Sequence, residues 1–408
     1  MFALRGADEN AEPYVSKTAD LRRRLIRLLA PPENQSRRLN LRERVARIEY
    51  SLTGSDFESG FLLYRLLRQE FSKTYAKRLR LHHAAMIRLN LENAYPRAYV
   101  TNKLGKFTGK SLYYGPFRSR AVAEKFMNDS LDLFKIRRCT FELNPDPSYP
   151  GCVYSEMKMC LAPCFKGCTD EEYATEVARV QAWFDSSGQS PIAELEIERD
   201  RLSADLQFEA AAELHARIAK LKGVASGADE LTSRIDQLNA VIIQRSAEPE
   251  SVALFRFNHG ELCGPAQVNI PKAAQTRKDG TTAEPDKTAE AEKTAETEKV
   301  ANNPVTESLD KATKDAIEDA IASLTSSGAV TARETSEELA LVKRWYYRTH
   351  KTGEIVFARR DGQLSLRKVV NACERVLHGK KAAPESPAAQ PQTQGSAPGE
   401  LPPTSAES

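Results

Sequence analysis

The chain has 408 residues, of which 41% are hydrophobic and 28% are charged. This length allows two or three domains with apolar cores, and the polar excess predicts linkers or tails in addition. No apolar run approaches the roughly 20 residues of a membrane span, and the first residues lack the apolar stretch of a signal peptide. We therefore expect a cytoplasmic protein without a membrane partner, whose cysteines are thiols or metal ligands rather than disulfides.

The net charge of +3 conceals a strong asymmetry along the chain. Residues 1–138 contain 28 Lys and Arg against 14 Asp and Glu, whereas the remaining residues contain 31 against 42. A basic segment of this size indicates a polyanionic partner, most often nucleic acid. The alternative is an arginine-rich surface that is simply solvated.

In chain order, the first predicted helix covers residues 18–29, where Leu21, Leu25 and Leu28 recur at helical spacing. Two prolines end this helix. A second helix is predicted near residues 56–71. A strand at residues 97–101 is followed by a loop rich in Gly and Lys.

The second half of the chain combines helices with a β-hairpin and low-complexity segments. Residues 271–308 contain repeated TAExxK hexads, and residues 380–408 are rich in proline. Neither segment can bury enough apolar area to fix one fold, so both are predicted to be disordered. The other predicted elements are a helix at 170–186, a helical hairpin at 191–223, a β-hairpin at 251–270 around Asn258-His259-Gly260, a helix near 308–324 and a segment at 336–377.

The aromatic string Arg344-Trp345-Tyr346-Tyr347 lies in the last of these segments. Its rings are of the kind that stack on bases. Aromatic clusters more often form a small core, and we favour that interpretation.

Five of the seven cysteines lie within residues 139–168. The first four are separated by 12, 7 and 3 residues, and Cys168 follows after three more. Thiolates gathered in this way suit either tetrahedral Zn²⁺ or an iron–sulfur cluster. The alternative is that some of them are buried free cysteines.

The string CysLeuAlaProCys at 160–164 follows TyrProGlyCysValTyr, and Tyr114-Gly115-Pro116-Phe117 stands upstream. Together these strings resemble the UvrC family, the C component of the excinuclease ABC system. The resemblance covers residues 1 to about 270, with a weaker likeness at 336–377. It implies a [4Fe–4S] cluster, with zinc as the alternative, and leaves Cys168 as a free thiol or spare ligand. The implied ligands are Cys139, Cys152, Cys160 and Cys164.

Residues 191–224 resemble the UVR module of this family, with Leu206-Gln207-Phe208-Glu209 at the centre. Apolar residues recur on both predicted helices, and a lone hairpin cannot bury two apolar stripes, so it needs a partner. An intramolecular helical arm is the alternative. The resemblance implies that the hairpin docks onto UvrB, the B component of the excinuclease ABC system, through Leu206, Phe208, Ala211, Ala212 and Leu214.

Residues 1–80 resemble a GIY-YIG nuclease domain, in which a metal-assisted water attacks a DNA phosphodiester. Tyr14-Val15-Ser16-Lys17, followed by Arg24, matches the signature of that domain in part. The resemblance implies that Tyr14, Lys17 and Arg24 are remnants of a catalytic site. The basic side of the first predicted helix adds three candidate DNA-binding residues, Arg22, Arg23 and Arg27.

The sequence departs from the GIY-YIG pattern at positions that perform the chemistry. The metal-binding glutamate aligns with Tyr64, and the GIY tyrosine aligns with Phe2, which has no hydroxyl group. The remaining departures are Ser16 at the YIG glycine, Leu28 at a helix tyrosine and Ala76 at an asparagine.

No nearby acid replaces the missing carboxylate. Glu58 and Glu70 each lie six residues from Tyr64, which is about 120° around a helix from the required face. We therefore predict a degenerate domain that grips phosphate without cutting it. Mg²⁺ or Mn²⁺ is required only if the domain does cut.

The predicted fold class is α+β. A small mixed α/β GIY-YIG-like domain comes first, and a cysteine-rich helical region, a helical hairpin and a partial β unit follow it. The predicted boundaries are 1–82 for the GIY-YIG-like domain, 83–190 for a linker strand and the cysteine-rich region, 191–226 for the UVR hairpin, 227–270 for the partial β unit, 271–308 for the linker, 309–379 for a small helical and β segment, and 380–408 for the tail.

Three functions stay open at this point. The first is a repair protein that binds DNA and UvrB with an inactive nuclease site. The second is an active GIY-YIG endonuclease that makes one incision beside a lesion. The third is an adaptor that uses the UVR hairpin and has no role on DNA. No small-molecule substrate is expected in any of them.

Overall fold

The computed structural model describes residues 1–8, 11–31, 39–271, 311–326, 328, 330–359 and 361–379. The predicted tail at 380–408 and nearly all of the predicted linker at 271–308 lie outside the described residues. No helix within these ranges is both long enough and apolar enough to cross a membrane.

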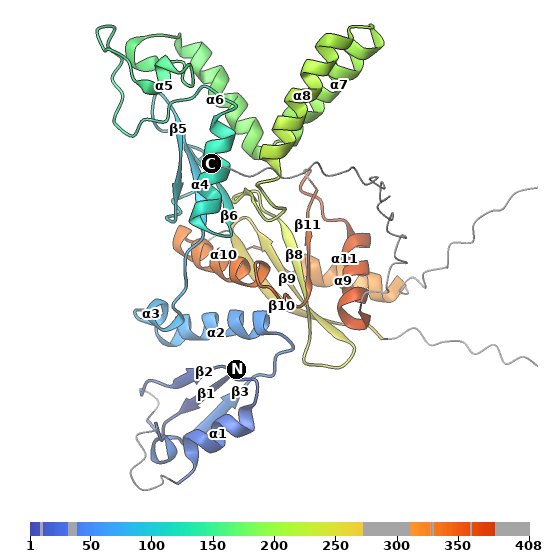
Figure 1. The fold of residues 1–408 in the computed structure, drawn as a ribbon. Coiled ribbons are helices and arrows are strands. Elements are labelled where there is room, and N and C mark those ends of the chain that lie inside the picture. The colour runs from blue at the N-terminus through green and yellow to red at the C-terminus, as the bar shows by residue number, and fades with distance from the viewer. Residues whose placement is uncertain are drawn as a thin grey trace, which may run out of the picture.

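The chain begins with a small lobe built on a three-stranded antiparallel sheet (Figure 1). Strand β1 (Phe2–Arg5) pairs with β2 (Tyr14–Ser16) on one side and β3 (Arg47–Tyr50) on the other. Helix α1 (Leu21–Leu29) begins at Asp20, whose side chain accepts a hydrogen bond from the Arg23 amide. A short 3₁₀ turn, η1 (Arg42–Arg44), precedes β3. The core of this N-terminal lobe is Phe2, Leu4, Leu28 and Leu41.

Helices α2 (Asp56–Glu70) and α3 (Tyr75–Leu79) connect the N-terminal lobe to the rest of the molecule. Their apolar side chains join a core shared with the C-terminal domain rather than the core of the lobe. The Tyr64 and Tyr75 hydroxyls both donate to the Glu337 carboxylate, at 3.2 and 2.9 Å respectively. The predicted 1–82 segment is therefore divided between two cores.

The middle domain contains more sheet than the sequence predicted. Its four strands stand in the order β5-β4-β6-β7, and α4 (Arg120–Leu131) and α6 (Asp170–Asp185) pack against them. Only β5 was predicted as a strand, because β4 is a short apolar run and β6 contains the turn-forming pair Gly115-Pro116. The strands are β4 (Ala85–Asn90), β5 (Arg97–Thr101), β6 (Ser111–Phe117) and β7 (Ser233–Arg234), and the cysteine-rich loops contain α5 (Val153–Glu156) and the 3₁₀ turn η2 (Pro163–Phe165).

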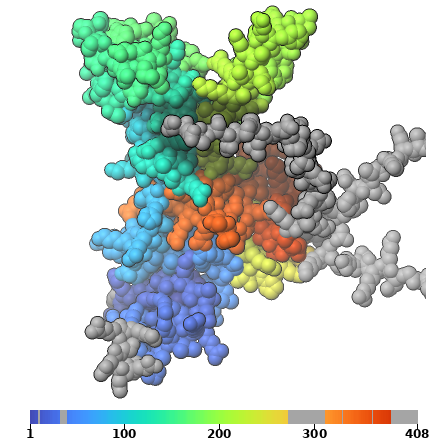
Figure 2. Space-filling view, in the orientation of Figure 1, coloured from blue at the N-terminus to red at the C-terminus, as the bar shows by residue number. Residues whose placement is uncertain are grey.

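A helical hairpin projects from the middle domain, as predicted (Figures 1 and 2). It consists of α7 (Gln189–Ala204) and α8 (Phe208–Ala225). Its base does not stand alone, because Ile192, Ile218 and Leu221 are buried in the middle-domain core. Only the part of the hairpin beyond this base is accessible to a binding partner.

The C-terminal domain is a four-stranded antiparallel sheet with helices on both faces. The sheet order is β10-β9-β8-β11, so the predicted segments 227–270 and 309–379 share one sheet. Alternate residues of β8 and β9 face α9 and α11 on one side and α2 and α10 on the other. The elements are β8 (Ala240–Arg245), β9 (Ser251–Asn258), β10 (Glu261–Asn269), α9 (Lys311–Ser323), α10 (Ala332–Tyr346), β11 (Glu354–Phe357) and α11 (Leu366–His378).

The predicted β-hairpin and aromatic core are both present in this domain. His259 and Gly260 have φ angles of 48° and 81° between β9 and β10, as expected for a tight two-residue turn. The Trp345 side chain is buried and its indole Nε1–H donates to the Thr352 carbonyl. The α+β fold class is confirmed.

Glu338 on α10 gives the C-terminal domain a pH-dependent stability. It is buried, accepts a hydrogen bond from the Leu262 amide at 2.7 Å, and burial raises its pKa to about 7. The folded protein therefore holds this proton more tightly than the unfolded chain, so the contribution of Glu338 is most favourable below pH 4.5. It declines as pH rises from 4.5 to 7, by on the order of 3 kcal/mol.

We predict that Glu338→Gln removes this decline and stabilises the protein above pH 7, because a neutral amide still accepts from Leu262. Urea unfolding at pH 5 and pH 8 measures the difference between the variant and the wild type. Equal pH dependence in the two proteins contradicts the assignment.

Candidate nucleic-acid interface and cysteine cluster

Two of the three predicted remnant residues lie together in the N-terminal lobe. Arg24 on α1 donates from Nη2 to the Tyr14 hydroxyl of β2 at 2.8 Å. The Arg24 Nε is buried and has no hydrogen-bond partner among the described residues. This pair therefore presents one unused donor, which is suited to an anion.

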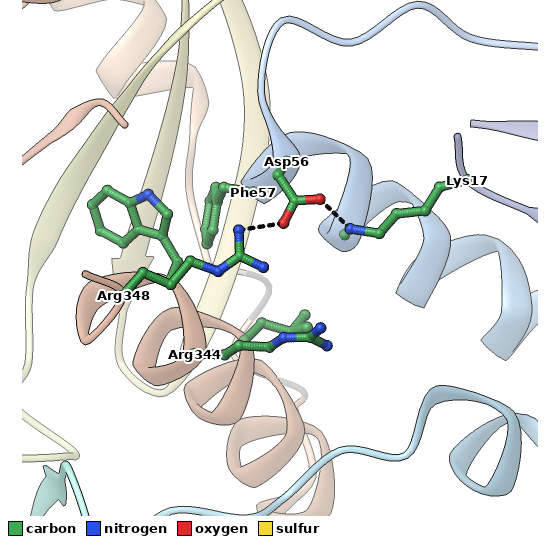
Figure 3. Close-up of a pocket in the computed structure, with 8 residues that line it drawn as sticks. Lys17, Asp56, Phe57, Arg344 and Arg348 are labelled. Carbon is green, nitrogen blue, oxygen red and sulfur yellow. Dashed lines mark hydrogen bonds and ion pairs between the residues drawn. The ribbon is translucent and has the colours of Figure 1, made fainter. Parts of the chain in front are cut away.

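Lys17, the third predicted residue, has a different partner. Its ammonium group forms an ion pair with Asp56 at the start of α2 (Figure 3). Asp56 also pairs with Arg348 at 2.6 Å. Burial, the largest contribution, raises the pKa of Asp56, but the two cations outweigh it and the net shift of the pKa is downward. Asp56 is thus an ionised carboxylate between two cations.

The cleft around Asp56 is narrow. Phe57, Gly60, Leu341 and Trp345 complete its walls, and its volume is about 30 Å³. A cavity of this size holds a water molecule. A nucleotide does not fit inside this cleft.

Two wider grooves open on either side of Asp56. One, of about 560 Å³, runs from Asp56 past Lys17 along the N-terminal lobe. The other, of about 500 Å³, runs from Asp56 past the end of α10 and along α11. We call the continuous surface the junction groove. Its cations are Lys17, Arg245, Arg344, Arg348 and Arg375, and its acids are Asp56 and Glu354.

Sequence reasoning missed the junction groove. Its cations come from distant parts of the chain, and four of the five lie in the part with a net negative charge. The charge asymmetry directed attention to residues 1–138 instead. The one signal in the sequence was the basic character of the string around Trp345.

The outer face of α1 is a separate basic surface. Arg22, Arg23 and Arg27 are exposed, as predicted, and none of them forms an ion pair with another described residue. Ile26, also on this helix, is 58% exposed. The three arginines are therefore accessible to the phosphates of a nucleic acid.

Three of the positions that depart from the predicted GIY-YIG pattern are buried in apolar cores. Phe2 and Leu28 lie in the core of the N-terminal lobe. Tyr64 has no exposed surface and faces α10. Glu58 accepts a hydrogen bond from the Gly54 amide, and Glu70 pairs with Arg5, so neither acid serves the Tyr14 and Arg24 pair.

Four of the five clustered cysteines come together in the loops around α5 and η2. The thiol of Cys160 has its pKa raised to about 11 by burial, and the thiols of Cys139, Cys152 and Cys164 add to that increase. Cys168 lies at the edge, next to Glu172 and Asp170. Among the described residues, no three His, Cys, Asp or Glu side chains are arranged to hold a single metal ion as they stand.

Two donors are directed at these sulfur atoms. The Ala162 amide lies 3.3 Å from the Cys160 Sγ, and the Arg137 guanidinium lies 3.9 Å from the Cys139 Sγ. Arg137 is buried, and its Nε has no partner in the described part of the chain. A soft four-sulfur donor set with N–H donors behind it fits the chemistry of an iron–sulfur cluster.

The hairpin exposes Ile197 in the middle of α7 and two large apolar residues at its tip. Leu206 is 73% exposed and Phe208 is 62% exposed. Ala212 is also exposed, whereas Ala211 is buried and Leu214 is half-buried. Of the five predicted partner-binding residues, Leu206, Phe208 and Ala212 are therefore the accessible ones.

Comparison with known proteins identifies the centre of the chain. Residues 84–183 match the family described as "UvrC/Cho excinuclease, middle domain", and residues 189–224 match the "UvrB/uvrC motif". The chain carries a UvrC-type middle domain and a UVR motif. The resemblance predicted from the cysteine strings and the hairpin is thereby confirmed. The matched residues begin at 84, so the GIY-YIG likeness of residues 1–82 stays a prediction.

Curated relatives match this chain over part of their length. A "UvrABC system protein C" of Idiomarina loihiensis is 28% identical over 259 residues, which are 62% of this chain and 40% of that protein. Proteins of the same name from Methanothermobacter thermautotrophicus and Rickettsia felis are both 27% identical, over 62% and 66% of this chain. This chain spans about two fifths of the length of these relatives. No solved structure matches the chain.

The contacts of Asp56 predict a gain of function on substitution. Asp56→Asn removes the charge that neutralises Lys17 and Arg348. We expect affinity for a short DNA duplex to rise several-fold at low salt, and the salt dependence to steepen. Fluorescence anisotropy measures both quantities. Glu124→Gln is the matched control, because it also removes one acid from a surface ion pair, on α4.

Proposed function

We propose that this protein acts in nucleotide excision repair by binding DNA and UvrB, without cutting DNA itself. The observation that carries the proposal is the burial of Tyr64, a residue of α2, against α10. The matches to the UvrC-type middle domain and the UVR motif support a role in nucleotide excision repair. A cytoplasmic location follows from this role and stays a prediction.

The absence of cutting is supported by chemistry and by access. A tyrosine at position 64 cannot replace a carboxylate as a ligand for Mg²⁺. Its hydroxyl already donates to Glu337, and α10 covers the face of α2 on which the family places the metal ligand. Restoring a glutamate at this position would place a second buried charge beside Glu337.

One observation favours the alternative function, an endonuclease that makes one incision beside a lesion. Tyr14 and Arg24 keep their hydrogen bond, and the Arg24 Nε donor is unused. Such a pair can polarise a phosphate. It cannot position a metal-bound water without an acid nearby, so we place this function second.

DNA binding is supported by the exposed arginines of α1 and by the junction groove. We predict that replacing Arg22, Arg23 and Arg27 together by glutamate weakens duplex binding at least tenfold. The salt slope should fall by about one for each phosphate that the protein no longer binds. Anisotropy titrations from about 50 to 200 mM salt provide the measurement.

The matched control for this test is the triple Lys311→Glu, Arg367→Glu and Lys368→Glu. It makes the same change in net charge on exposed residues of α9 and α11. An equal loss of affinity in both triple variants would indicate a general charge effect rather than a binding surface. No loss in either would contradict the proposed DNA binding.

Partner binding is supported by the exposed tip of the UVR hairpin. We predict that Leu206→Asp with Phe208→Asp abolishes binding to purified UvrB and leaves duplex binding within twofold. Surface plasmon resonance measures the first and anisotropy the second. Val122→Asp on α4, where the side chain is 40% exposed, is the control. Unchanged binding by the double variant would place the partner elsewhere.

We propose further that Cys139, Cys152, Cys160 and Cys164 hold a [4Fe–4S] cluster. When bound, such a cluster supplies a rigid cross-link between these loops and a centre able to exchange an electron. The proposal is supported by the N–H groups that the chain directs at two of these sulfurs, those of Cys139 and Cys160. Cys168 stands outside this set.

Metal content after anaerobic purification tests this assignment. We predict that Cys164→Ser loses iron, acid-labile sulfide and visible absorbance, whereas Cys168→Ser retains all three. If the wild type contains zinc and no sulfide, and Cys164→Ser loses that zinc, the site binds zinc rather than an iron–sulfur cluster. Retention of iron in Cys164→Ser would contradict both assignments.

A further inference from the structure

A third basic surface lies on the middle domain, on the face of its sheet that is turned away from the middle-domain core. Arg88 on β4 stands directly opposite Tyr99 on β5 and Tyr113 on β6. The Arg97 and Arg88 guanidinium carbons lie 4.9 and 5.8 Å from the centre of the Tyr99 ring. One aromatic ring is therefore flanked by two planar cations. We call Arg88, Tyr99 and Arg97 the sheet platform.

The loop after β5 adds positive charge beside the sheet platform. Lys103, Lys106 and Lys110 are exposed and form no ion pair with a described residue. Residues 88–118 contain six Lys and Arg and a single acid, Glu92, which pairs with Arg88 at 3.3 Å. Apart from that one pair, the charge of this segment is available to an external anion.

The sheet platform is not needed for the core. Ile87, Leu89, Ala98 and Val100 point to the opposite face and are buried there. On the platform face, the C-terminal domain covers only Met86 and Tyr113 among the described strand residues. Arg88, Arg97 and Tyr99 remain half-exposed at the uncovered end of this face.

We propose that the sheet platform binds one strand of unpaired nucleic acid. Bases stack on the Tyr99 ring and the flanking guanidinium planes, and the lysines of residues 102–110 hold the phosphates. Stacking requires bases with an open face, which a single strand offers and a closed duplex does not. This inference rests on the proposed DNA binding and specifies the form of DNA that one surface recognises.

The test compares fluorescein-labelled oligo(dT) of about 20 nucleotides, enough to span one such site, with a duplex of the same length. We expect Tyr99→Ala to lower affinity for oligo(dT) about tenfold and duplex affinity less than twofold. Tyr99→Phe keeps the ring and retains binding. Arg97→Lys keeps the charge but loses the planar group, so its affinity falls between those of the wild type and Arg97→Ala.

The α1 triple variant separates this inference from the proposed function. This variant, with glutamate at positions 22, 23 and 27, should lose more affinity for the duplex than for oligo(dT). Equal loss of both DNA forms in Tyr99→Ala, with Tyr99→Phe also impaired, would overturn stacking. If the wild type binds the duplex but not oligo(dT), the single-strand inference is wrong and the proposed function stands. Failure to bind either DNA would overturn the proposed function as well.

Discussion

Helix α2 is packed on both sides, and the arrangement of the N-terminal half of the molecule depends on it. Both of its ends are tied to the N-terminal lobe, by Lys17 at Asp56 and by Arg5 at Glu70, the latter pair at 2.7 Å. The other side buries Phe57, Phe61 and Tyr64 against the C-terminal sheet and α10. Burial of three aromatic side chains contributes several kcal/mol that any opening of this interface must overcome.

The buried interface explains why position 64 is a tyrosine. At the centre of the α2 and α10 interface the Tyr64 ring supplies apolar area, and its hydroxyl satisfies the Glu337 carboxylate together with Tyr75 and Arg333. A carboxylate at position 64 would meet Glu337 and the buried Glu338 instead. The tyrosine that permits this packing stands where the predicted GIY-YIG likeness expects a metal ligand. Phe2 and Leu28, two other positions that depart from the predicted pattern, also pack in a core, that of the lobe.

How far the sequence predicted the molecule depends on the range of each contact. Local patterns found α1, α2, α6, the UVR hairpin and the β9–β10 turn, because periodicity and turn residues act over a few positions. The four-cysteine set could be proposed from the sequence because its members lie within 26 residues, and it stays a prediction. Tyr64 and Glu337 are 273 positions apart in the sequence, and no local pattern predicts their contact.

The same reason explains the functional surfaces that sequence reasoning missed. The junction groove draws on Lys17, Arg245 and Arg348, which only the fold brings together. The sheet platform requires the register of β4 against β5, and β4 was not predicted as a strand. Charge counting found that the chain is basic at one end, but it could not show which cations share a surface.

The measurement that tests the central claim most directly is a nicking assay. The protein, purified without oxygen, is incubated with a labelled lesion-bearing duplex, UvrB, ATP, and Mg²⁺ or Mn²⁺, and Arg24→Ala is tested in parallel. We predict a duplex that is bound but remains intact, in the wild type and the variant alike. A nick made by the wild type and absent in Arg24→Ala would show that the site cuts, and would contradict the proposed role.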